Sequence, residues 1–304
     1  MKKSLLIVED FIGSRLDRWI KKKVCKIPQS LIEKNIRKGK IKVNNKKEKS
    51  SYKIRKNDKV DFYNFNFSSN INKTKNFIYK PSKKEISYST KLFIENNENF
   101  AVINKPAGIP VQSGTKAKKN IIDILRSTKE FNNYIPFSVH RIDKETTGVL
   151  IVAKNRKYAQ LFTSLFRLRK IHKIYIGLVI GEVLKSNGIL EDILLYDEGK
   201  KKIKTKALTH YDVIDSNNNY SLLKLIPETG RKHQLRKQLL IRGHPIYGDT
   251  KYNLKDNKIK KKSKLMLHAY KIFFKINNIK YNFSAELPLN FKETIKEKNL
   301  RISL

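Results

Sequence analysis

Four consecutive aliphatic residues, Val149 to Val152, constrain the fold of this chain more than any other stretch. Three of the four are β-branched, and a short unbroken apolar run of this kind predicts a strand buried in a sheet. A polar loop, Ser138 to Gly148, precedes the run and carries a histidine, an arginine, an aspartate and a glutamate. Because a rigid strand can hold such a loop still, the loop is a candidate functional site. A charged turn before a core strand is the alternative.

The composition of the chain points to a polyanionic partner. The 304 residues include 67 Lys and Arg against 27 Asp and Glu, which gives a formal net charge of +40. A field of this size favours nucleic acid as the partner. Lys, Asn and Ile are abundant, however, and their codons can be built almost wholly from A and T. Part of the charge can therefore reflect genome composition, and the charge supports nucleic-acid binding without proving it.

Several features favour a cytoplasmic protein. The single cysteine, Cys25, excludes an internal disulfide, and its helical context predicts a small core residue. No apolar run approaches the roughly 20 residues that cross a bilayer. The short apolar stretch after Met1 is ended by acids, unlike a signal peptide. We expect no membrane contact, a cytoplasmic location and, by default, a monomer.

Residues 1–65 are predicted to form a small basic domain. A helix is expected from Gly13 to Lys26, and a second helix begins at Ser30-Leu31-Ile32-Glu33, which has the form of a capping box. Gly39 is expected to end the second helix in a left-handed conformation. The remaining apolar positions predict short strands and a turn, at Ile41, Val43, Asn44-Asn45, Tyr52, Ile54, Val60 and Phe62.

Residues 66–90 are rich in Asn, Ser and Lys and are predicted to be a linker, and residues 91–304 are predicted to form a larger domain. In this domain, strands are expected at 92–97, 100–106, 149–152, 175–180, 220–226, 269–276 and 280–287, and helices at 121–126, 155–169 and 231–242. Many strands with few intervening helices predict an α+β fold, with a mixed, mostly antiparallel sheet flanked by helices.

A second polar stretch, residues 228–239, is predicted to open a helix with Thr229 as its cap. Three basic residues fall in the expected first turns, where the helix dipole favours an anion: Arg231, His233 and Arg236. Because the neighbouring Leu235 faces the core, Arg236 is expected at the edge of buried space, where a guanidinium needs a carboxylate partner. Asp143 is the natural candidate; a basic helix that contacts phosphate or solvent is the alternative.

Tyr175, in Lys173-Ile174-Tyr175, stands at the start of an expected strand. A tyrosine in this position most often packs in the core. It can also stack on a nucleic-acid base and present its hydroxyl group.

The N-terminal pattern resembles the S4 RNA-binding module. The resemblance rests on Arg15-Leu16-Asp17, Pro28-Gln29-Ser30 and residues 36–44. It implies RNA binding by basic residues of this unit, with Arg15, Arg37 and Lys38 as the candidates. The S4 fold occurs in ribosomal proteins, synthetases and RNA-modifying enzymes, so it implies a ligand class and no particular reaction. A solvated basic domain is the alternative.

The larger domain resembles the RNA pseudouridine synthases of the family that modifies large-subunit ribosomal RNA. The matches are ordered along the chain at Asn104-Lys105-Pro106-Ala107-Gly108, His140-Arg141-Ile142-Asp143, Thr146-Thr147-Gly148, Lys173-Ile174-Tyr175, residues 229–236, residues 243–249 and Leu267-His268-Ala269. The chain departs mildly from the family pattern at Ile142, Thr147, Gly177, Lys232 and Leu235. None of these departures falls on a residue with an implied catalytic role.

The resemblance implies isomerisation of uridine to pseudouridine, a reaction that breaks the N1–C1′ bond, turns the uracil and rejoins it through C5. No metal or cofactor is implied. Asp143 is implied as the carboxylate that acts at the sugar, by attack on C1′, by assisting loss of the base or by proton transfer at C2′. Arg236 would hold Asp143 ionised, and Tyr175 would stack on the uracil near C5. Substrate contacts with the flipped nucleotide are implied at Arg141, His140, Leu235 and Arg231.

The implied partner is large-subunit ribosomal RNA or its precursor particles. A catalytically silent RNA-binding or ribosome-assembly factor is the alternative, which the presence of Asp143, Tyr175 and Arg236 disfavours. A metal-dependent nuclease is a weaker alternative. His140 and Glu145 lie close to Asp143, but the sequence has no clustered carboxylate pair of the two-metal type.

Overall fold

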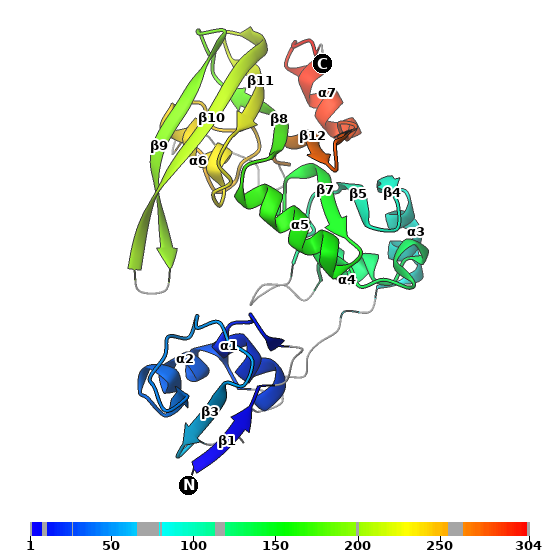
Figure 1. The fold of residues 1–304 in the computed structure, drawn as a ribbon. Coiled ribbons are helices and arrows are strands. Elements are labelled where there is room, and N and C mark those ends of the chain that lie inside the picture. Colours follow the sequence, from blue (N-terminus) through cyan, green and yellow to red (C-terminus); the bar gives the residue numbers. More distant parts are fainter. Residues whose placement is uncertain are drawn as a thin grey trace. The chain divides into compact units, whose positions relative to one another are not determined.

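The computed structural model describes residues 2–7, 11–25, 27–65, 79, 81–112, 119–198, 201–254 and 264–302. The chain divides into two compact units, residues 1–77 and 78–304 (Figure 1). Both units combine helices with strands, which confirms the predicted α+β class. Within the described ranges, no helix is long and apolar enough to cross a membrane.

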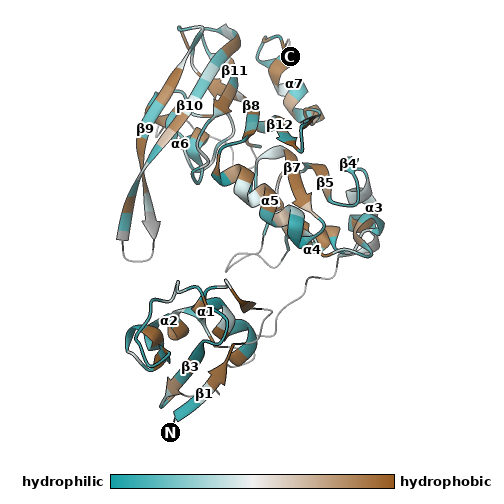
Figure 2. Cartoon of the chain, in the orientation of Figure 1, coloured by the Kyte–Doolittle hydropathy of each residue, from teal (hydrophilic) through white to brown (hydrophobic). Residues whose placement is uncertain are grey.

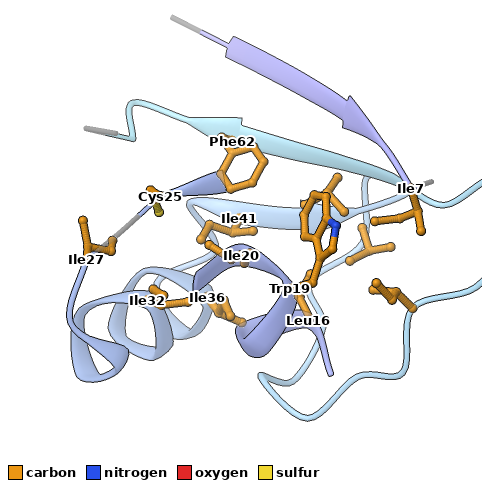
Figure 3. Close-up of a cluster of buried hydrophobic side chains, with 13 residues drawn as sticks. Ile7, Leu16, Trp19, Ile20, Cys25, Ile27, Ile32, Ile36, Ile41 and Phe62 are labelled. Carbon is orange, nitrogen blue, oxygen red and sulfur yellow. The ribbon is translucent and has the colours of Figure 1, made fainter. Parts of the chain in front are cut away.

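The first unit packs helices against a three-stranded antiparallel sheet of order β1-β3-β2. Its elements are β1 (Lys2–Leu6), α1 (Leu16–Trp19), the π-helical turn η2 (Ile20–Val24), α2 (Gln29–Arg37), β2 (Ile41–Val43) and β3 (Lys59–Tyr63). Figure 3 shows the core between them, where Trp19 and Ile20 from the helices meet Phe62 from β3. Cys25 is buried in the same cluster, as predicted.

The helices of the first unit differ from the prediction at their beginnings. The expected single helix from Gly13 divides into α1 and η2. The predicted capping box is wrong, because α2 begins after Pro28 and no side chain caps it. The helix begins one residue before Ser30, which places Ser30 inside it, and Glu33 accepts a hydrogen bond from Gln29 Nε2 (3.1 Å). Gly39 follows the helix with φ of +72°, as predicted.

The second half of the first unit agrees with the prediction in part. Strands β2 and β3 and the turn at Asn44-Asn45, where both residues have positive φ, are present. Tyr52 and Ile54 belong to no strand, and the nearest ladder contact is an isolated bridge between Arg15 and Lys53.

The second unit is built on one ten-stranded sheet. Its main path runs β4-β5-β7-β12-β8-β11-β10-β9, with β6 paired to β7 and β13 paired to β12. The strands are β4 (Phe93–Asn96), β5 (Phe100–Lys105), β6 (Phe137–Ser138), β7 (Thr147–Ala153), β8 (Ile171–Ile180), β9 (Asn187–Glu198), β10 (Lys201–Asn217), β11 (Tyr220–Pro227), β12 (Leu267–Ile276) and β13 (Ile279–Ser284). The pairing is antiparallel except between β7 and β12, which confirms a mixed, mostly antiparallel sheet.

Helices flank this sheet. They are α3 (Lys83–Thr90), α4 (Ile121–Leu125), the 3-10 turn η3 (Lys129–Phe131), α5 (Arg156–Arg167), α6 (Gln234–Ile241) and α7 (Leu289–Glu297). The sequence predicts α4 and α5 closely and predicts neither α3 nor α7. Helix α3 lies in the range expected to be linker, and it carries a true capping box between Ser82 and Glu85. Residues 66–78 of that range lie outside the described residues.

Strand β7 is buried along its whole length because it separates two apolar cores. Figure 2 shows it coloured as a hydrophobic strand. Leu150 and Val152 pack with α4 on one face, and Val149 and Ile151 pack with Phe162 of α5 on the other. An aliphatic residue is needed at every position of such a strand, which explains the unbroken apolar run. The predicted buried strand is therefore confirmed.

The long hairpin of β9 and β10 was not predicted (Figure 1). Leu190 and Leu194 point into the core, yet Ile189 and Ile193 on the opposite face are also aliphatic, with 58% and 69% of their surface exposed. The alternation that identifies a half-buried strand is therefore lost in the sequence.

We predict that Gly148→Ala destabilises the second unit by about 3 kcal/mol or more. Gly148 has φ of +111°, and an added Cβ would lie 2.2 Å from the carbonyl oxygen of Ala269 on β12. Urea denaturation measures the loss. Gly243→Ala is the matched control, because Gly243 has φ of +79° with open space around it and should lose only about 1–2 kcal/mol. Equal losses for the two variants would show that the close contact with β12 is unimportant.

Candidate active site

A cavity of about 610 Å³ opens at the end of the sheet where β7, β8 and α6 begin. Its volume is within the range of small-ligand sites. Seven of the ten residues predicted for substrate binding or catalysis line this one cavity: His140, Arg141, Asp143, Tyr175, Arg231, Leu235 and Arg236. The other three, Arg15, Arg37 and Lys38, belong to the first unit.

The loop before β7 is held in place by Lys105 at the end of β5. The Nζ atom of Lys105 donates hydrogen bonds to the carbonyl oxygens of Pro106 (2.7 Å), Ile109 (3.0 Å) and Lys144 (3.1 Å). The Lys144 carbonyl also accepts from the amide of Gly108 (3.0 Å). Burial lowers the pKa of Lys105 to about 7. These contacts fix the backbone one residue after Asp143.

His140 supports the other end of the same loop. Its Nε2 atom accepts a hydrogen bond from the amide of Ile151 in β7 (2.9 Å), and its ring stacks on Phe166 of α5 at 4.5 Å. Burial lowers the pKa of His140 to about 3, which keeps the ring neutral and able to accept this bond. The structure therefore gives His140 a role in orienting the loop, beside the substrate contact predicted for it.

Arg236 meets two carboxylates, and the closer one is Asp249. The guanidinium donates to both oxygens of Asp249, at 2.6 and 2.7 Å, whereas Nη1 lies 3.3 Å from Oδ2 of Asp143. Asp249 is fully buried and also accepts the amides of Lys251 and Tyr252 at 2.9 Å. The predicted pairing of Arg236 with Asp143 is present, but Asp249 is the residue that holds the guanidinium.

The entry to α6 differs from the prediction. The helix begins at Gln234, so Arg231 and His233 precede it, and the predicted cap by Thr229 is wrong. The Thr229 hydroxyl instead donates to Gln234 Oε1 (2.7 Å), and Gln234 Nε2 reaches the carbonyl of Leu208 on β10 (3.1 Å). A buried polar network thus ties the start of α6 to the long hairpin.

The cavity wall also includes an aromatic ring, an aliphatic side chain and a lysine. Tyr175 on β8 is half-buried, and burial with the nearby Asp143 charge raises the pKa of its hydroxyl well above the usual value, so the hydroxyl stays protonated. Leu235 is buried in the core beneath it. Burial lowers the pKa of Lys173 to about 8. Within the part of the chain that the structure describes, Lys173 has no hydrogen-bond or ion-pair partner.

The cavity lining is strongly basic. Arg141, Arg231 and Lys232 are exposed at its edge, and further cations come from the end of α5, the turn after it and the start of β8, namely Arg167, Arg169 and Lys173. Asp143 and Glu228 are the carboxylates among the lining residues. In the described ranges, no group of three or more His, Cys, Asp or Glu side chains is placed to hold a metal ion.

The three predicted RNA-binding residues of the first unit differ in their surroundings. Arg37 and Lys38 are exposed at the end of α2. Arg15 is half-buried and its Nη2 lies 2.5 Å from Asp17, a carboxylate with no exposed surface. This pairing gives Arg15 a structural task in addition to the predicted contact with RNA.

Residues 99–240 match the family model described as RNA pseudouridylate synthase, and residues 14–60 match the S4 domain model. A ribosomal large subunit pseudouridine synthase C from Buchnera aphidicola subsp. Baizongia pistaciae is 33% identical, over 97% of this chain and 96% of that protein. The chain belongs to the RNA pseudouridine synthase family. A relative with the same name from Rickettsia felis is 32% identical, over 94% of this chain and 97% of its own.

Solved structures support this assignment. The structure titled human RNA pseudouridylate synthase domain containing 4 superposes with a TM-score of 0.62 at 25% identity, over 71% of this chain and 96% of that chain. A second human structure, titled domain containing 1, has a TM-score of 0.55 at 22% identity and supports the fold alone. A catalytically active synthase is therefore favoured over a silent RNA-binding factor.

Sequence reasoning missed several residues of this site. Asp249 and Lys105 lie inside motifs that the family resemblance identified, yet their burial and contacts become visible only in the fold. Tyr252 falls beyond the motifs. His233 has a left-handed backbone with φ of +53°, which its sequence context does not indicate.

We predict that His268 makes the second unit less stable at acid pH. Its Nε2 donates to the carbonyl of Ala285 (3.0 Å), and its Nδ1 accepts from the hydroxyl of Thr147 (2.7 Å). Burial lowers the pKa of His268 from 6.5 to about 4. Stability from the neutral ring is fully present above pH 6.5 and is lost as the pH falls to 4, by about 3 kcal/mol in all. NMR titration of the folded protein checks this prediction, and protonation of His268 near pH 6.5 would contradict it.

Proposed function

We propose that this protein isomerises uridine to pseudouridine in large-subunit ribosomal RNA or its precursor particles. The observation that carries the proposal is Asp143, a carboxylate held by Arg236 at a basic cavity large enough for a nucleotide. Two further findings support the substrate. The relatives from Buchnera and Rickettsia are named as synthases of the ribosomal large subunit, and they match this chain over nearly its whole length.

The reaction balances without an external reagent. The N1–C1′ bond breaks, the uracil turns, and a C5–C1′ bond forms in its place. The proton lost from C5 is balanced by the proton that N1 gains once its bond to C1′ has been broken. The protein must therefore bind a flipped nucleotide, stabilise the sugar when the base has left, and hold the free uracil while it turns.

Asp143 acts at the sugar, as a nucleophile, as an electrostatic partner or in proton transfer. Its side chain is 19% exposed and borders the cavity, so it can reach C1′ of a bound nucleotide. Arg236 pairs with the carboxylate, and the guanidinium is itself fixed by Asp249. A group held in this way needs no reorganisation when the bond breaks.

Tyr175 and Leu235 form the pocket for the uracil. The ring of Tyr175 offers a flat surface for stacking, which fits a base that must turn without leaving. Because its hydroxyl is protonated, Tyr175 serves as a hydrogen-bond donor near the base when RNA binds. Arg141 and Arg231 are exposed at the cavity edge, where they contact RNA flanking the flipped nucleotide. His140 contributes by holding the loop and lies close enough to contact the same RNA.

The first unit supplies additional RNA contacts. Its match to the S4 domain model and the exposed Arg37 and Lys38 support docking on folded RNA. Contacts of this kind are to phosphates and shape, so they add affinity without selecting a uridine.

We predict that Asp143→Asn abolishes turnover and retains RNA binding. Asparagine keeps the shape of the side chain and removes its charge, so the loss should exceed the roughly 10²–10⁴-fold effect of a lost proton-transfer group. The measurement is pseudouridine formed per enzyme on ribosomal RNA, together with a filter-binding curve.

Glu145→Gln is the matched control for this variant. Glu145 is in the same loop, is 49% exposed and pairs with Lys144, so it carries the same charge outside the cavity. Its removal should leave turnover within about twofold, as expected for a surface ion pair. If Asp143→Asn retains a tenth of wild-type turnover, the loop is a structural turn and the proposal is wrong.

We predict that Lys173 binds a phosphate of the substrate. Lys173→Met should raise KM about tenfold, leave kcat nearly unchanged and lower the salt dependence of binding by about one counterion. The free energy of unfolding should rise, because the variant removes an ammonium group that is partly out of water. Lys170→Met is the control, since Lys170 is exposed and outside the cavity. Equal effects of the two variants on KM would contradict the prediction.

A further inference from the structure

His233 has a strained backbone at the edge of the cavity. It is the residue before α6, with φ of +53° and ψ of +31°, and its side chain makes no capping hydrogen bond to the helix. A non-glycine residue in this left-handed region is uncommon, and glycine or asparagine adopts it more easily. The helix start therefore does not explain a histidine at this position, and the reason must be in what the side chain contacts.

The imidazole of His233 joins Tyr252 to Asp143. Its Nδ1 atom lies 2.8 Å from the hydroxyl oxygen of Tyr252, and its Nε2 atom lies 3.7 Å from Oδ1 of Asp143. The side chain is 16% exposed. Burial lowers the pKa of His233 to about 4 and raises that of Tyr252, so the ring is neutral and the hydroxyl is protonated.

With a neutral ring and a protonated hydroxyl, the carboxylate of Asp143 decides the direction of the contact. The Tyr252 hydroxyl donates to Nδ1, which leaves the single ring proton on Nε2, facing the carboxylate. The opposite tautomer would turn a nitrogen lone pair toward the Asp143 charge. The distance of 3.7 Å is longer than a hydrogen bond, and such contacts in a substrate-free site shorten when substrate binds.

Tyr252 connects the two sides of Asp143. Its amide donates to Asp249 Oδ1 (2.9 Å), and its ring faces the Arg236 guanidinium at 5.0 Å. Arg236 approaches Oδ2 of Asp143, whereas His233 approaches Oδ1. A different N–H group therefore faces each oxygen of the carboxylate, and both groups are held by the segment at Asp249 to Tyr252.

We propose that His233 and Tyr252 are positioning residues for this reaction: the Tyr252 hydroxyl orients the His233 ring, and the ring orients Asp143 from the oxygen that Arg236 does not reach. The inference rests on the proposed function of Asp143. Arg236 supplies charge along one direction only, and a single contact leaves a carboxylate free to rotate about its χ2 angle. The second donor removes that rotation, which sets the oxygen that faces C1′.

The experiment measures kcat and KM for pseudouridine formation on ribosomal RNA with the full chain. Tyr252→Phe removes one oxygen and keeps the ring beneath Arg236. It should lower kcat about tenfold, with KM and the melting temperature unchanged, because misplacement of a catalytic group lowers turnover and leaves substrate binding intact. His233→Gln retains an N–H donor at the position of Nε2, and it should recover at least half of the kcat that His233→Gly loses.

His233→Gly separates the side chain from the backbone. Glycine relieves the left-handed strain, so a residue with a purely structural role would show unchanged or improved turnover when replaced by glycine. We expect kcat to fall about tenfold or more despite the relieved backbone. The double variant Tyr252→Phe with His233→Gly should have the same kcat as His233→Gly alone, because the hydroxyl acts through the ring.

Several results would overturn the inference. Full kcat in Tyr252→Phe would show that the Tyr252 hydroxyl does not position the His233 ring for the reaction. Additive losses in the double variant would show that the two residues act separately, and a change in KM with unchanged kcat would make His233 an RNA contact. Wild-type enzyme is measured in the same assay, and absence of pseudouridine there would refute the proposed function itself, whatever the variants do.

Discussion

The guanidinium of Arg236 is the contact on which the site depends. It is 9% exposed, and its two hydrogen bonds to the buried Asp249 leave one edge for Asp143. Asp249 neutralises the buried guanidinium. The second carboxylate, Asp143, lies 3.3 Å from Arg236 and remains available to a substrate whose charge changes during the reaction. Removing Asp249 would leave a buried cation and lower the free energy of unfolding by about 3–5 kcal/mol. The same contact therefore serves stability and chemistry.

Strand β7 transmits the rigidity of the sheet to this site. It is covered by a core on each face, and its first residues are locked to β12 by the close approach of Gly148 to the Ala269 backbone. His140 and Lys105 extend this support to the loop that carries Asp143. Burial lowers the pKa of three of the six histidines, His140, His233 and His268, and each neutral ring then serves the framework as a donor or an acceptor.

The parts that could be predicted from the sequence are those with local signals. The apolar run of β7 and the spacing of apolar residues in α5 predicted these two elements. The ordered motifs predicted that Asp143, Tyr175 and Arg236 belong to one site, and all three line the same cavity. The hairpin of β9 and β10 was missed because Ile189 and Ile193 are exposed, which removes the alternation. The role of Asp249 could not be deduced, because the sequence does not show which of the two carboxylates lies closer to Arg236. The capping box predicted at Ser30 is wrong because the helix already begins at Gln29, after Pro28.

The pairing of β7 with β12 also has a consequence for the order of folding. Thr147 and His268 are neighbours in the sheet but 121 residues apart in the chain, and β12 is the strand that separates β7 from β8. Loop closure over such a distance is slow, so local elements such as α5 and the β9–β10 hairpin form earlier. During synthesis the loop with Asp143 leaves the ribosome long before its partner strand. The enzyme therefore acquires its active geometry only after β12 has been made.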